Sequence, residues 1–274
     1  MKIILYGSEG TIGTEVKNLL LKKKADIYLV ENKKKIKLHK KYKIVKNNFF
    51  NKKNFIKEND ILIYLAWGSL NDFNSKLHTN RELHRHYFNI KRLIENGLKN
   101  IIISGTCLEY KKTIGSLSEK SEVYPVTKYG IAKNKLRIKL EGLKKKYKIN
   151  LSWLRIFYIY GNSNNNNNLW SKIINFSSKN KTKDFNMSSG EQFRDYIHVK
   201  DLAKLIIIIS LKKKNYGIIN VCSGKPVQIK ELVKKWKLKY KLNINFKFNR
   251  LAMPSYESIK FWGNNKKLKN ILKK

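Results

Sequence analysis

The stretch "YGIAK", Tyr129 to Lys133, places a phenol and an amine four residues apart at the start of a helix-like run. Residues four apart lie on one face of a helix, so Lys133 can lie beneath the hydroxyl of Tyr129. A cation about 4 Å from a phenol contributes on the order of 4 kcal/mol at an effective dielectric of 20, or about three pKa units. The pKa of Tyr129 is therefore expected to fall from about 10 toward about 7, where a phenol exchanges protons with a carbonyl or hydroxyl group.

This spacing alone does not identify a site, because the chain holds 15 tyrosines and 53 lysines among 274 residues. Chance gives about three Tyr-x-x-x-Lys matches in such a composition. The residues around Tyr129 must therefore supply the specificity. The chain contains six matches, which begin at Tyr42, Tyr87, Tyr124, Tyr129, Tyr196 and Tyr256.

Three glycines, Gly7, Gly10 and Gly13, separate the apolar run "KIILY" from the amphipathic run "TEVKNLLLKK". In a dinucleotide-binding turn the first glycine permits the tight bend, the second admits the pyrophosphate, and the third lets the helix pack closely on the strand. Backbone N–H groups and the helix dipole then meet the phosphates. An ordinary strand-to-helix turn is the alternative, and the strand before and helix after favour a dinucleotide site.

Glu31 ends the run "DIYLVE", eighteen residues beyond Gly13, where the dinucleotide fingerprint expects an acid. Its carboxylate would accept a hydrogen bond from the adenosine ribose and repel a 2′-phosphate, which favours NAD. Lys33, Lys34 and Lys35 follow at once and could reverse this preference. NAD is therefore the expected cofactor, with NADP as the alternative.

Short apolar runs alternate with helix-like runs through the first half of the chain. The strand-like runs are nearly continuously apolar, which predicts an α/β fold with a Rossmann-type, doubly wound parallel sheet. The alternation stops at "GNSNNNNNLW", where Asn164 to Asn168 are expected to form an exposed loop. We expect an NAD(P)-binding Rossmann domain over residues 1–160 and a smaller, mainly substrate-binding α+β portion over 161–274, with 193–222 returning to the Rossmann domain.

The net charge of +41 first suggests a nucleic acid or an anionic membrane as partner. Lysines outnumber arginines 53 to 7 and are scattered along the chain, although arginine is better suited to bidentate phosphate contacts. We interpret most of the charge as a solvated surface that reflects A/T-rich codons. Neither nucleic acid as the main partner nor a membrane is expected.

Cys107 and Cys222 provide neither a disulfide framework nor a metal-ligand spacing, so no metal site is expected. The apolar run before Gly7 is too short for a signal peptide, and "LAKLIIIIS" is too short to cross a bilayer. These features predict a cytoplasmic protein.

Five segments follow the glycine turn in a fixed order: "IIISGTCLEY" (101–110), "YPVTKYGIAKNKL" (124–136), "LRIFYIYG" (154–161), "FRDYIHVKDLA" (193–203) and "INVCSGKPVQIKEL" (219–232). Together they resemble the extended short-chain dehydrogenase/reductase superfamily, which contains NAD-dependent epimerases, dehydratases and reductases of nucleotide sugars. The resemblance spans nearly the whole chain. It implies a nucleoside-diphosphate sugar as substrate and a homodimer to which residues 129–146 contribute a helix.

The resemblance assigns catalytic roles by motif position. Tyr129 matches the general acid/base, and Lys133 matches the residue that lowers its pKa and holds the nicotinamide ribose. Thr106 matches the hydroxyl residue that hydrogen-bonds the reacting sugar oxygen.

Further binding residues follow from the same motifs. Arg194 matches an arginine that grips the substrate diphosphate with its planar donors, the alternative being a surface ion pair with Asp195 or Asp201. Tyr158, which replaces the usual Asn of "LRxxNxYG", is expected to contact the substrate together with Thr106. Cofactor contacts are also expected from Thr11, Ile12, Leu65 and Ala66.

One departure from the superfamily pattern narrows the activity. Dehydratases place an Asp-Glu pair directly after the catalytic threonine, whereas this chain has Cys107 and Leu108 there, and Glu109 lies one place further on. The other motif words resemble the 4-keto-reductase branch most. The expected reaction is hydride transfer at C4 of the sugar, with reduction of a dTDP-4-keto-6-deoxyhexose favoured. The alternatives are a UDP-hexose 4-epimerase with tightly bound NAD and a non-catalytic cofactor-binding protein that binds nucleic acid.

Overall fold

The structure is a computed structural model that describes residues 1–31, 40–46, 48, 55–161, 168–179, 183–253 and 255–273. Its centre is a seven-stranded parallel sheet in the order β11-β7-β5-β4-β1-β2-β3. This arrangement confirms the predicted Rossmann-type sheet. The strands are β1 (Lys2–Tyr6), β2 (Asp26–Val30), β3 (Lys43–Val45), β4 (Ile61–Tyr64), β5 (Asn100–Thr106), β7 (Asn150–Ile156) and β11 (Gly217–Val221).

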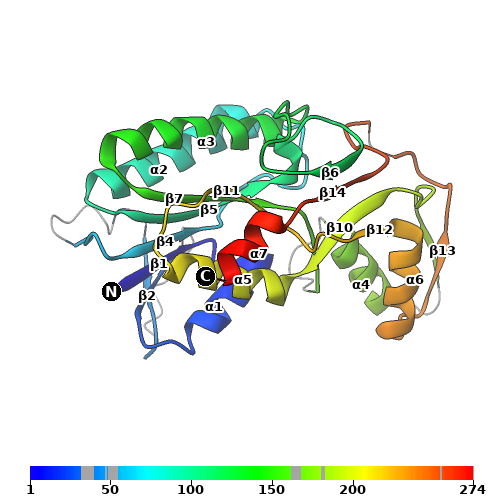
Figure 1. Cartoon of the computed structure of the whole chain (residues 1–274). Helices are drawn as coiled ribbons and strands as arrows, with labels where there is room; N and C mark the ends of the chain where they lie inside the picture. The colour runs from blue at the N-terminus through cyan, green and yellow to red at the C-terminus, as the bar shows by residue number, and fades with distance from the viewer. Residues whose placement is uncertain are drawn as a thin grey trace.

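Helices cover both faces of this sheet (Figure 1). Helices α2 (Leu83–Glu95) and α3 (Lys128–Tyr147) lie on one face, and α1 (Thr11–Leu20), α5 (Val199–Leu211) and α7 (Lys266–Lys273) lie on the other. Successive side chains of a strand point to opposite faces, so Ile4 enters the core under α2 and α3 while Ile3 and Leu5 enter the core over α1 and α5. Because each strand supplies two cores, its sequence is apolar at nearly every position.

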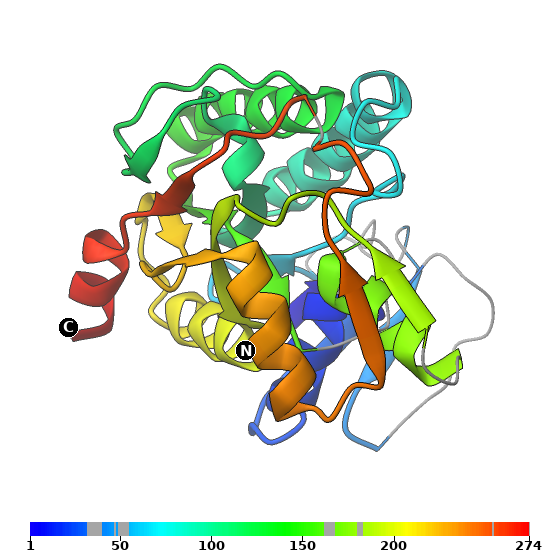
Figure 2. The same cartoon turned by 90° about the vertical axis from the view of Figure 1, so that its right-hand side faces the viewer.

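Most of the remaining elements form a smaller α+β portion beside the carboxyl ends of the sheet strands (Figure 2). Trp170 of α4 packs edge-on against Trp236 of α6, with ring centroids 5.0 Å apart. These elements are β6 (Gly115–Leu117), β8 (Tyr158–Tyr160), α4 (Leu169–Lys179), β9 (Lys183–Asn186), β10 (Phe193–His198), β12 (Pro226–Gln228), α6 (Ile229–Lys239), β13 (Ile244–Lys247) and β14 (Phe261–Gly263). The short η2 (His78–Glu82) instead packs against α2 and α3, and η3 (Cys107–Glu109) packs against α3.

The order of the strands fixes where a ligand can bind. Strands β1 and β4 are neighbours in the sheet, and the chain runs outward from them in opposite directions, through β2 and β3 on one side and through β5 and β7 on the other. Ligands of doubly wound sheets bind at such a point, beyond the carboxyl ends of the strands. The glycine turn after β1 and residue Leu65 after β4 both lie there.

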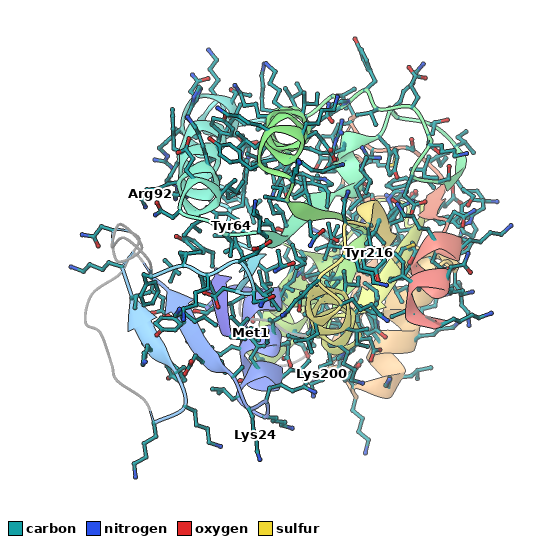
Figure 3. All side chains as sticks on the ribbon, turned by 60° about the vertical axis from the view of Figure 1, so that its left-hand side comes forward. Met1, Lys24, Tyr64, Arg92, Lys200 and Tyr216 are labelled. Carbon is teal, nitrogen blue, oxygen red and sulfur yellow. The ribbon has the colours of Figure 1, made fainter. Side chains whose placement is uncertain are left out.

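Lysine side chains such as Lys24 and Lys200 extend outward from different parts of the surface (Figure 3). Across the described residues, every helix is too short or too polar to span a bilayer. Two predictions fall mainly outside the described residues: the three lysines at 33–35 and the asparagine run up to residue 167. Asn168, which is described, begins α4 by accepting a hydrogen bond from the backbone N–H of Ser171 at 2.8 Å.

We propose the division of the chain into residues 1–160 and 161–274 as the organisation of its two parts. Helix α5 and strand β11 belong to the layers of the large sheet, whereas β10, at the start of the proposed return of residues 193–222, pairs with β8 and β12.

Candidate active site

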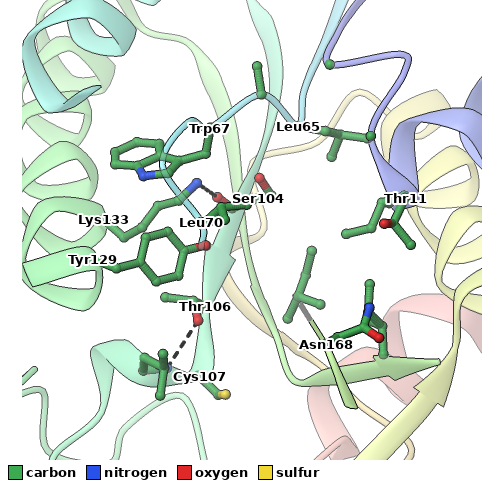
Figure 4. A pocket seen from close by; sticks show the side chains of 18 of the residues that line it. Thr11, Leu65, Trp67, Leu70, Ser104, Thr106, Cys107, Tyr129, Lys133 and Asn168 are labelled. Carbon is green, nitrogen blue, oxygen red and sulfur yellow. Dashed lines mark hydrogen bonds between the residues drawn. The ribbon is translucent and has the colours of Figure 1, made fainter. Parts of the chain in front are cut away.

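A cleft of about 460 Å³ opens at the predicted ligand position (Figure 4). The glycine turn lies on one side and the start of α3 lies on the other. Glu31 lines an adjoining pocket together with Gly7 and Gly10, and Arg194 lines neither. The predicted residues that line the cleft are Gly7, Gly10, Thr11, Ile12, Gly13, Leu65, Ala66, Thr106, Tyr129, Lys133 and Tyr158.

The glycine turn has the local geometry that a dinucleotide requires. Gly7 has a positive φ of 84°, which residues with a side chain rarely adopt. A Cβ at Gly13 would lie 1.8 Å from the carbonyl oxygen of Gly7, so only glycine lets α1 approach the turn this closely. A Cβ at Gly10 would meet only that same oxygen, at 3.5 Å, because this position faces the open cleft. Gly10 can therefore admit a pyrophosphate where a side chain would obstruct it.

The start of α1 supplies polar groups for an anion. Gly10 is the N-cap residue, and no side chain caps the first N–H groups of the helix. Thr11 is buried beside them, and its Oγ1 has no hydrogen-bond partner among the described residues. An anion at the helix N-terminus would satisfy both the N–H groups and this hydroxyl. The residues present therefore fit a dinucleotide phosphate.

Glu31 lies just beyond β2 and accepts a hydrogen bond from Ser8 Oγ at 2.9 Å. This contact ties the carboxylate to the glycine turn and places it at the pocket that continues the cleft. Its role as acceptor for a ribose hydroxyl stays a prediction.

Tyr129 is held in place by the first turn of α3. Thr127 caps this helix by accepting a hydrogen bond from Gly130 N at 3.0 Å, and Tyr129 N donates to Phe73 O at 2.9 Å. The Tyr129 ring stacks on Phe73 with centroids 5.2 Å apart. A Cβ at Gly130 would lie 2.3 Å from Leu108 O, so the glycine in "YGIAK" lets α3 pack against η3. This packing brings Tyr129 to the segment that carries the predicted catalytic threonine.

Lys133 lies one helical turn further along and is 1% exposed. Its Nζ donates a hydrogen bond to Ser104 O at 2.7 Å and lies 5.9 Å from the centroid of the Tyr129 ring. Burial lowers the pKa of Lys133 to about 7, and the charge of Glu109 partly opposes this effect. The predicted pair of Tyr129 and Lys133 therefore shares one cleft with the glycine turn (Figure 4).

The prediction that Lys133 lowers the pKa of Tyr129 toward neutrality is wrong for this structure. Burial raises the pKa of the Tyr129 phenol well above its ordinary value, Glu109 and Cys107 raise it further, and a hydrogen bond with Thr106 acts in the opposite direction. The reason is that burial disfavours both charged forms, the phenolate and the ammonium. The ammonium also bonds to the Ser104 carbonyl.

Thr106 ends β5 and is fixed by a buried carboxylate. Its backbone N–H donates to Glu109 Oε1 at 2.9 Å, and its Oγ1 accepts from Leu108 N at 3.3 Å. Glu109 also accepts from Trp153 Nε1 at 2.9 Å and from Arg155 Nε at 2.9 Å. Both carboxylate oxygens of Glu109 thus accept hydrogen bonds from buried donors, which gives this side chain a structural role. Its structural role was missed at the sequence level, although "TCLE" has the Thr-x-x-Glu spacing of a capping box.

Cys107 lines the cleft, and burial raises the pKa of its thiol to about 12. A protonated thiol is a poor nucleophile, so Cys107 is not expected to react with a substrate. It forms part of the wall of the cleft as a small apolar side chain. Among the described residues, no group of three or more His, Cys, Asp or Glu side chains could hold a metal ion.

Arg194, the residue predicted to grip the substrate diphosphate, is paired with an acidic side chain and does not line the cleft. Arg194 is 1% exposed, its Nη2 lies 2.6 Å from Glu257 Oε2, and its Nη1 donates to Phe193 O at 2.8 Å. Tyr158 donates a hydrogen bond to the other carboxylate oxygen, Glu257 Oε1, at 3.1 Å. Glu257 lines the cleft, so a carboxylate stands between Arg194 and the space where a substrate would bind.

The alternative for Arg194, a surface pair with Asp195 or Asp201, is wrong. Asp195 is buried and accepts hydrogen bonds from the backbone N–H groups of Ser223 and Gly224, at 2.7 and 2.8 Å. Asp201 pairs with a lysine on the surface of α5. Neither acid competes with Glu257, which reaches the guanidinium from a segment 63 residues away in the chain.

The sequence pattern of the NAD dependent epimerase/dehydratase family matches residues 3–222. The chain belongs to this family, which confirms the predicted family and NAD as the cofactor type. It is similar to dTDP-6-deoxy-L-talose 4-dehydrogenase (NAD(+)) of Aggregatibacter actinomycetemcomitans, with 30% identity over 271 residues, 96% of this chain and 99% of the relative. It is also similar to dTDP-4-dehydro-6-deoxyglucose reductase of Escherichia coli, with 27% identity over 61% of this chain and 51% of the relative.

Solved structures with the same fold agree with this assignment. The UDP-glucuronic acid 4-epimerase of Bacillus cereus, in complex with UDP-glucuronic acid and NAD, superposes with a TM-score of 0.81 at 17% identity, covering 100% of this chain and 93% of that one. The UDP-N-acetylglucosamine 4-epimerase of Methanobrevibacter ruminantium superposes with a TM-score of 0.80 at 20% identity, covering 98% and 91%. At these identities the likeness concerns the fold.

Proposed function

We propose that the protein is an NAD(P)-dependent oxidoreductase that acts at C4 of a nucleoside-diphosphate sugar and reduces a dTDP-4-keto-6-deoxyhexose. The observation that carries the proposal is the cleft in which Thr106, Tyr129 and Lys133 face the glycine turn. The substrate class is supported by the 30% identity that this chain shares with a dTDP-6-deoxy-L-talose 4-dehydrogenase over 99% of that relative. NAD is the proposed cofactor, with Glu31 as the acceptor for its ribose hydroxyl.

The chain's own residues suit the protonation step of a ketone reduction. When bound against the glycine turn, the cofactor supplies the hydride that reduces the carbonyl carbon. Tyr129, whose phenol is protonated at neutral pH, donates its proton to the carbonyl oxygen. Its raised pKa makes it a weak acid, so the phenolate that forms needs stabilisation. The hydroxyl of Thr106 hydrogen-bonds the same oxygen and orients it. The amine of Lys133 binds the cofactor ribose and, as an ammonium, stabilises the negative charge that Tyr129 acquires.

Substrate binding involves the part of the cleft lined by Tyr158 and Glu257. Tyr158 and Glu257 reach the cleft there, and Arg194 lies behind them. For Arg194 to grip a diphosphate, its guanidinium has to exchange the carboxylate of Glu257 for phosphate oxygens. We propose that the substrate diphosphate makes this exchange on binding.

The test of catalysis is the substitution Tyr129→Phe. Loss of the acid should lower turnover at least about 10²-fold, while NADH affinity measured by calorimetry stays the same. The matched control is Tyr124→Phe, because Tyr124 also precedes a lysine by four residues but is 65% exposed. Unchanged turnover in Tyr129→Phe would rule out the proposed acid.

A UDP-sugar 4-epimerase is the second candidate, favoured by the fold shared with two such epimerases. An epimerase retains its oxidised cofactor, whereas a reductase consumes one NADH for each sugar reduced. Purified protein is given dTDP-4-keto-6-deoxyglucose with NADH, and separately UDP-hexoses without added cofactor. Stoichiometric loss of NADH absorbance supports the reductase, and interconversion of UDP-hexoses without net redox change supports the epimerase.

We further propose a homodimer and a cytoplasmic location. Helices α2 and α3 pack side by side and expose Phe88 and Ile138, which are 60% and 54% exposed. A second copy of the chain could cover these side chains. Cys107 and Cys222 are both free thiols, as a reducing compartment requires.

A further inference from the structure

An aromatic ring covers the amine of Lys133 in the cleft. Trp67 follows β4, and the Nζ of Lys133 lies 4.2 Å from the centroid of its ring (Figure 4). The face of an indole carries negative potential and attracts a cation, most strongly where water is excluded. Lys133 is almost fully buried, and the hydrogen bond that its amine donates goes to Ser104 O. An ammonium carries three N–H donors, and the bond to Ser104 O uses one of them. The indole ring therefore occupies a position in which water would otherwise solvate the remaining charge.

Two buried histidines hold the plane of this ring. Trp67 Nε1 donates a hydrogen bond to His78 Nδ1 at 3.0 Å. Because that nitrogen accepts, the proton of neutral His78 lies on Nε2, which is 2.9 Å from Asp72 O and donates to it. Trp67 also stacks on His86, with centroids 4.6 Å apart and planes inclined by 23°. The indole is therefore fixed both in its plane and along its N–H direction.

His86 is itself fixed by hydrogen bonds at both ring nitrogens. Its Nε2 lies 3.1 Å from the buried carboxylate of Glu82, and its Nδ1 lies 2.6 Å from Tyr64 Oη. Burial lowers the pKa of His86 to about 4, so this ring is neutral at physiological pH. A neutral imidazole packs against the indole without repelling the cation of Lys133.

We propose that Trp67 is a positioning residue for Lys133, whose ammonium form it holds in the cleft through the face of its indole ring. The catalytic role of this contact rests on the proposed function, in which the ammonium of Lys133 stabilises the negative charge that Tyr129 acquires. The contact itself is a property of the folded chain and is measurable without a substrate.

The experiment places tryptophan with one to four ring fluorines at position 67 and measures the pKa of Lys133 by NMR titration of its side-chain amine. Fluorine withdraws electron density from the ring face but changes its size little. The ammonium form loses stabilisation, so the pKa of Lys133 should fall stepwise, by up to about 1.5 units if the whole contact is lost. The other groups around the amine, Glu109, Tyr129 and His86, are the same in every sample.

The matched control carries the same fluorinated residues at position 170, because Trp170 of α4 packs against Trp236 of α6 in a different core cluster. Fluorination there should leave the pKa of Lys133 unchanged. A pKa of Lys133 that is equal across the series at position 67 overturns the proposal. Trp67→Phe, which keeps an aromatic face, should retain more of the ammonium form than Trp67→Leu, and the reverse order also overturns it.

The pH profile of turnover links this contact to catalysis. Its inflection should shift across the fluorinated series in the same direction as the titration of Lys133. If no nucleotide sugar is turned over, the proposed function fails, whereas the NMR titration still decides whether Trp67 stabilises the ammonium.

Discussion

Replacing Glu109 by Gln should destabilise the protein strongly, although the change adds no volume. Glu109 is fully buried and receives N–H donors from Thr106, Trp153 and Arg155 at 2.9 Å each. A Gln side chain has one acceptor oxygen and adds an NH₂ group that would face these donors. Arg155 is also fully buried, so its charge would lose its partner at a cost of about 3–5 kcal/mol.

Urea unfolding followed by circular dichroism measures this loss as a change in the free energy of unfolding. The control is Glu122→Gln, whose carboxylate pairs with Lys111 at 2.9 Å on the open surface, and the expected change is below about 1 kcal/mol. The double variant Glu109→Leu, Arg155→Met removes the buried charges together but leaves the Thr106 N–H and Trp153 Nε1 without an acceptor. It should therefore recover only the part of the loss that comes from the unpaired guanidinium. A loss below about 1 kcal/mol for Glu109→Gln would refute the reasoning that this carboxylate holds the end of β5.

Three further predictions test the cofactor site, the buried amine and the dimer. Gly13→Ala should weaken both NADH binding and stability because its Cβ has no room, whereas Gly10→Ala should weaken NADH binding alone. Calorimetry measures the binding of NADH, and urea unfolding measures the stability of each variant. The pKa of Lys133 is about 7 when folded and about 10.4 when unfolded, so between these pH values the unfolded chain binds the extra proton and stability rises with pH. Relative to Lys133→Met, the free energy of unfolding should therefore increase by about 1.4 kcal/mol per pH unit, and a difference independent of pH would contradict the lowered pKa. Light scattering should show a dimer that Phe88→Ser with Ile138→Ser converts to a monomer, and a monomeric wild-type protein would contradict the proposed interface.

Features that depend on neighbours in the chain were predictable from the sequence. The alternation of strand-like and helix-like runs predicted the parallel sheet, because burial on both faces requires nearly continuous apolar strands. The glycine turn and the "YGIAK" helix start were recognisable because steric limits at Gly7, Gly13 and Gly130 act within a few residues or at one close packing contact. The residues that line the cleft follow from these elements and from the order of the motifs.

Interactions between distant segments were decided only by the tertiary structure. Glu257 reaches Arg194 across 63 residues, and Glu109 reaches Arg155 across 46 residues, so no local pattern predicts either ion pair. The pKa of Tyr129 also depends on burial, which results from the packing of the whole site. The four-residue spacing of Tyr129 and Lys133 alone therefore predicts the wrong direction for this pKa. Sequence spacing determines which side chains share a helix face, whereas desolvation and partners from remote segments determine which of those side chains carry a charge.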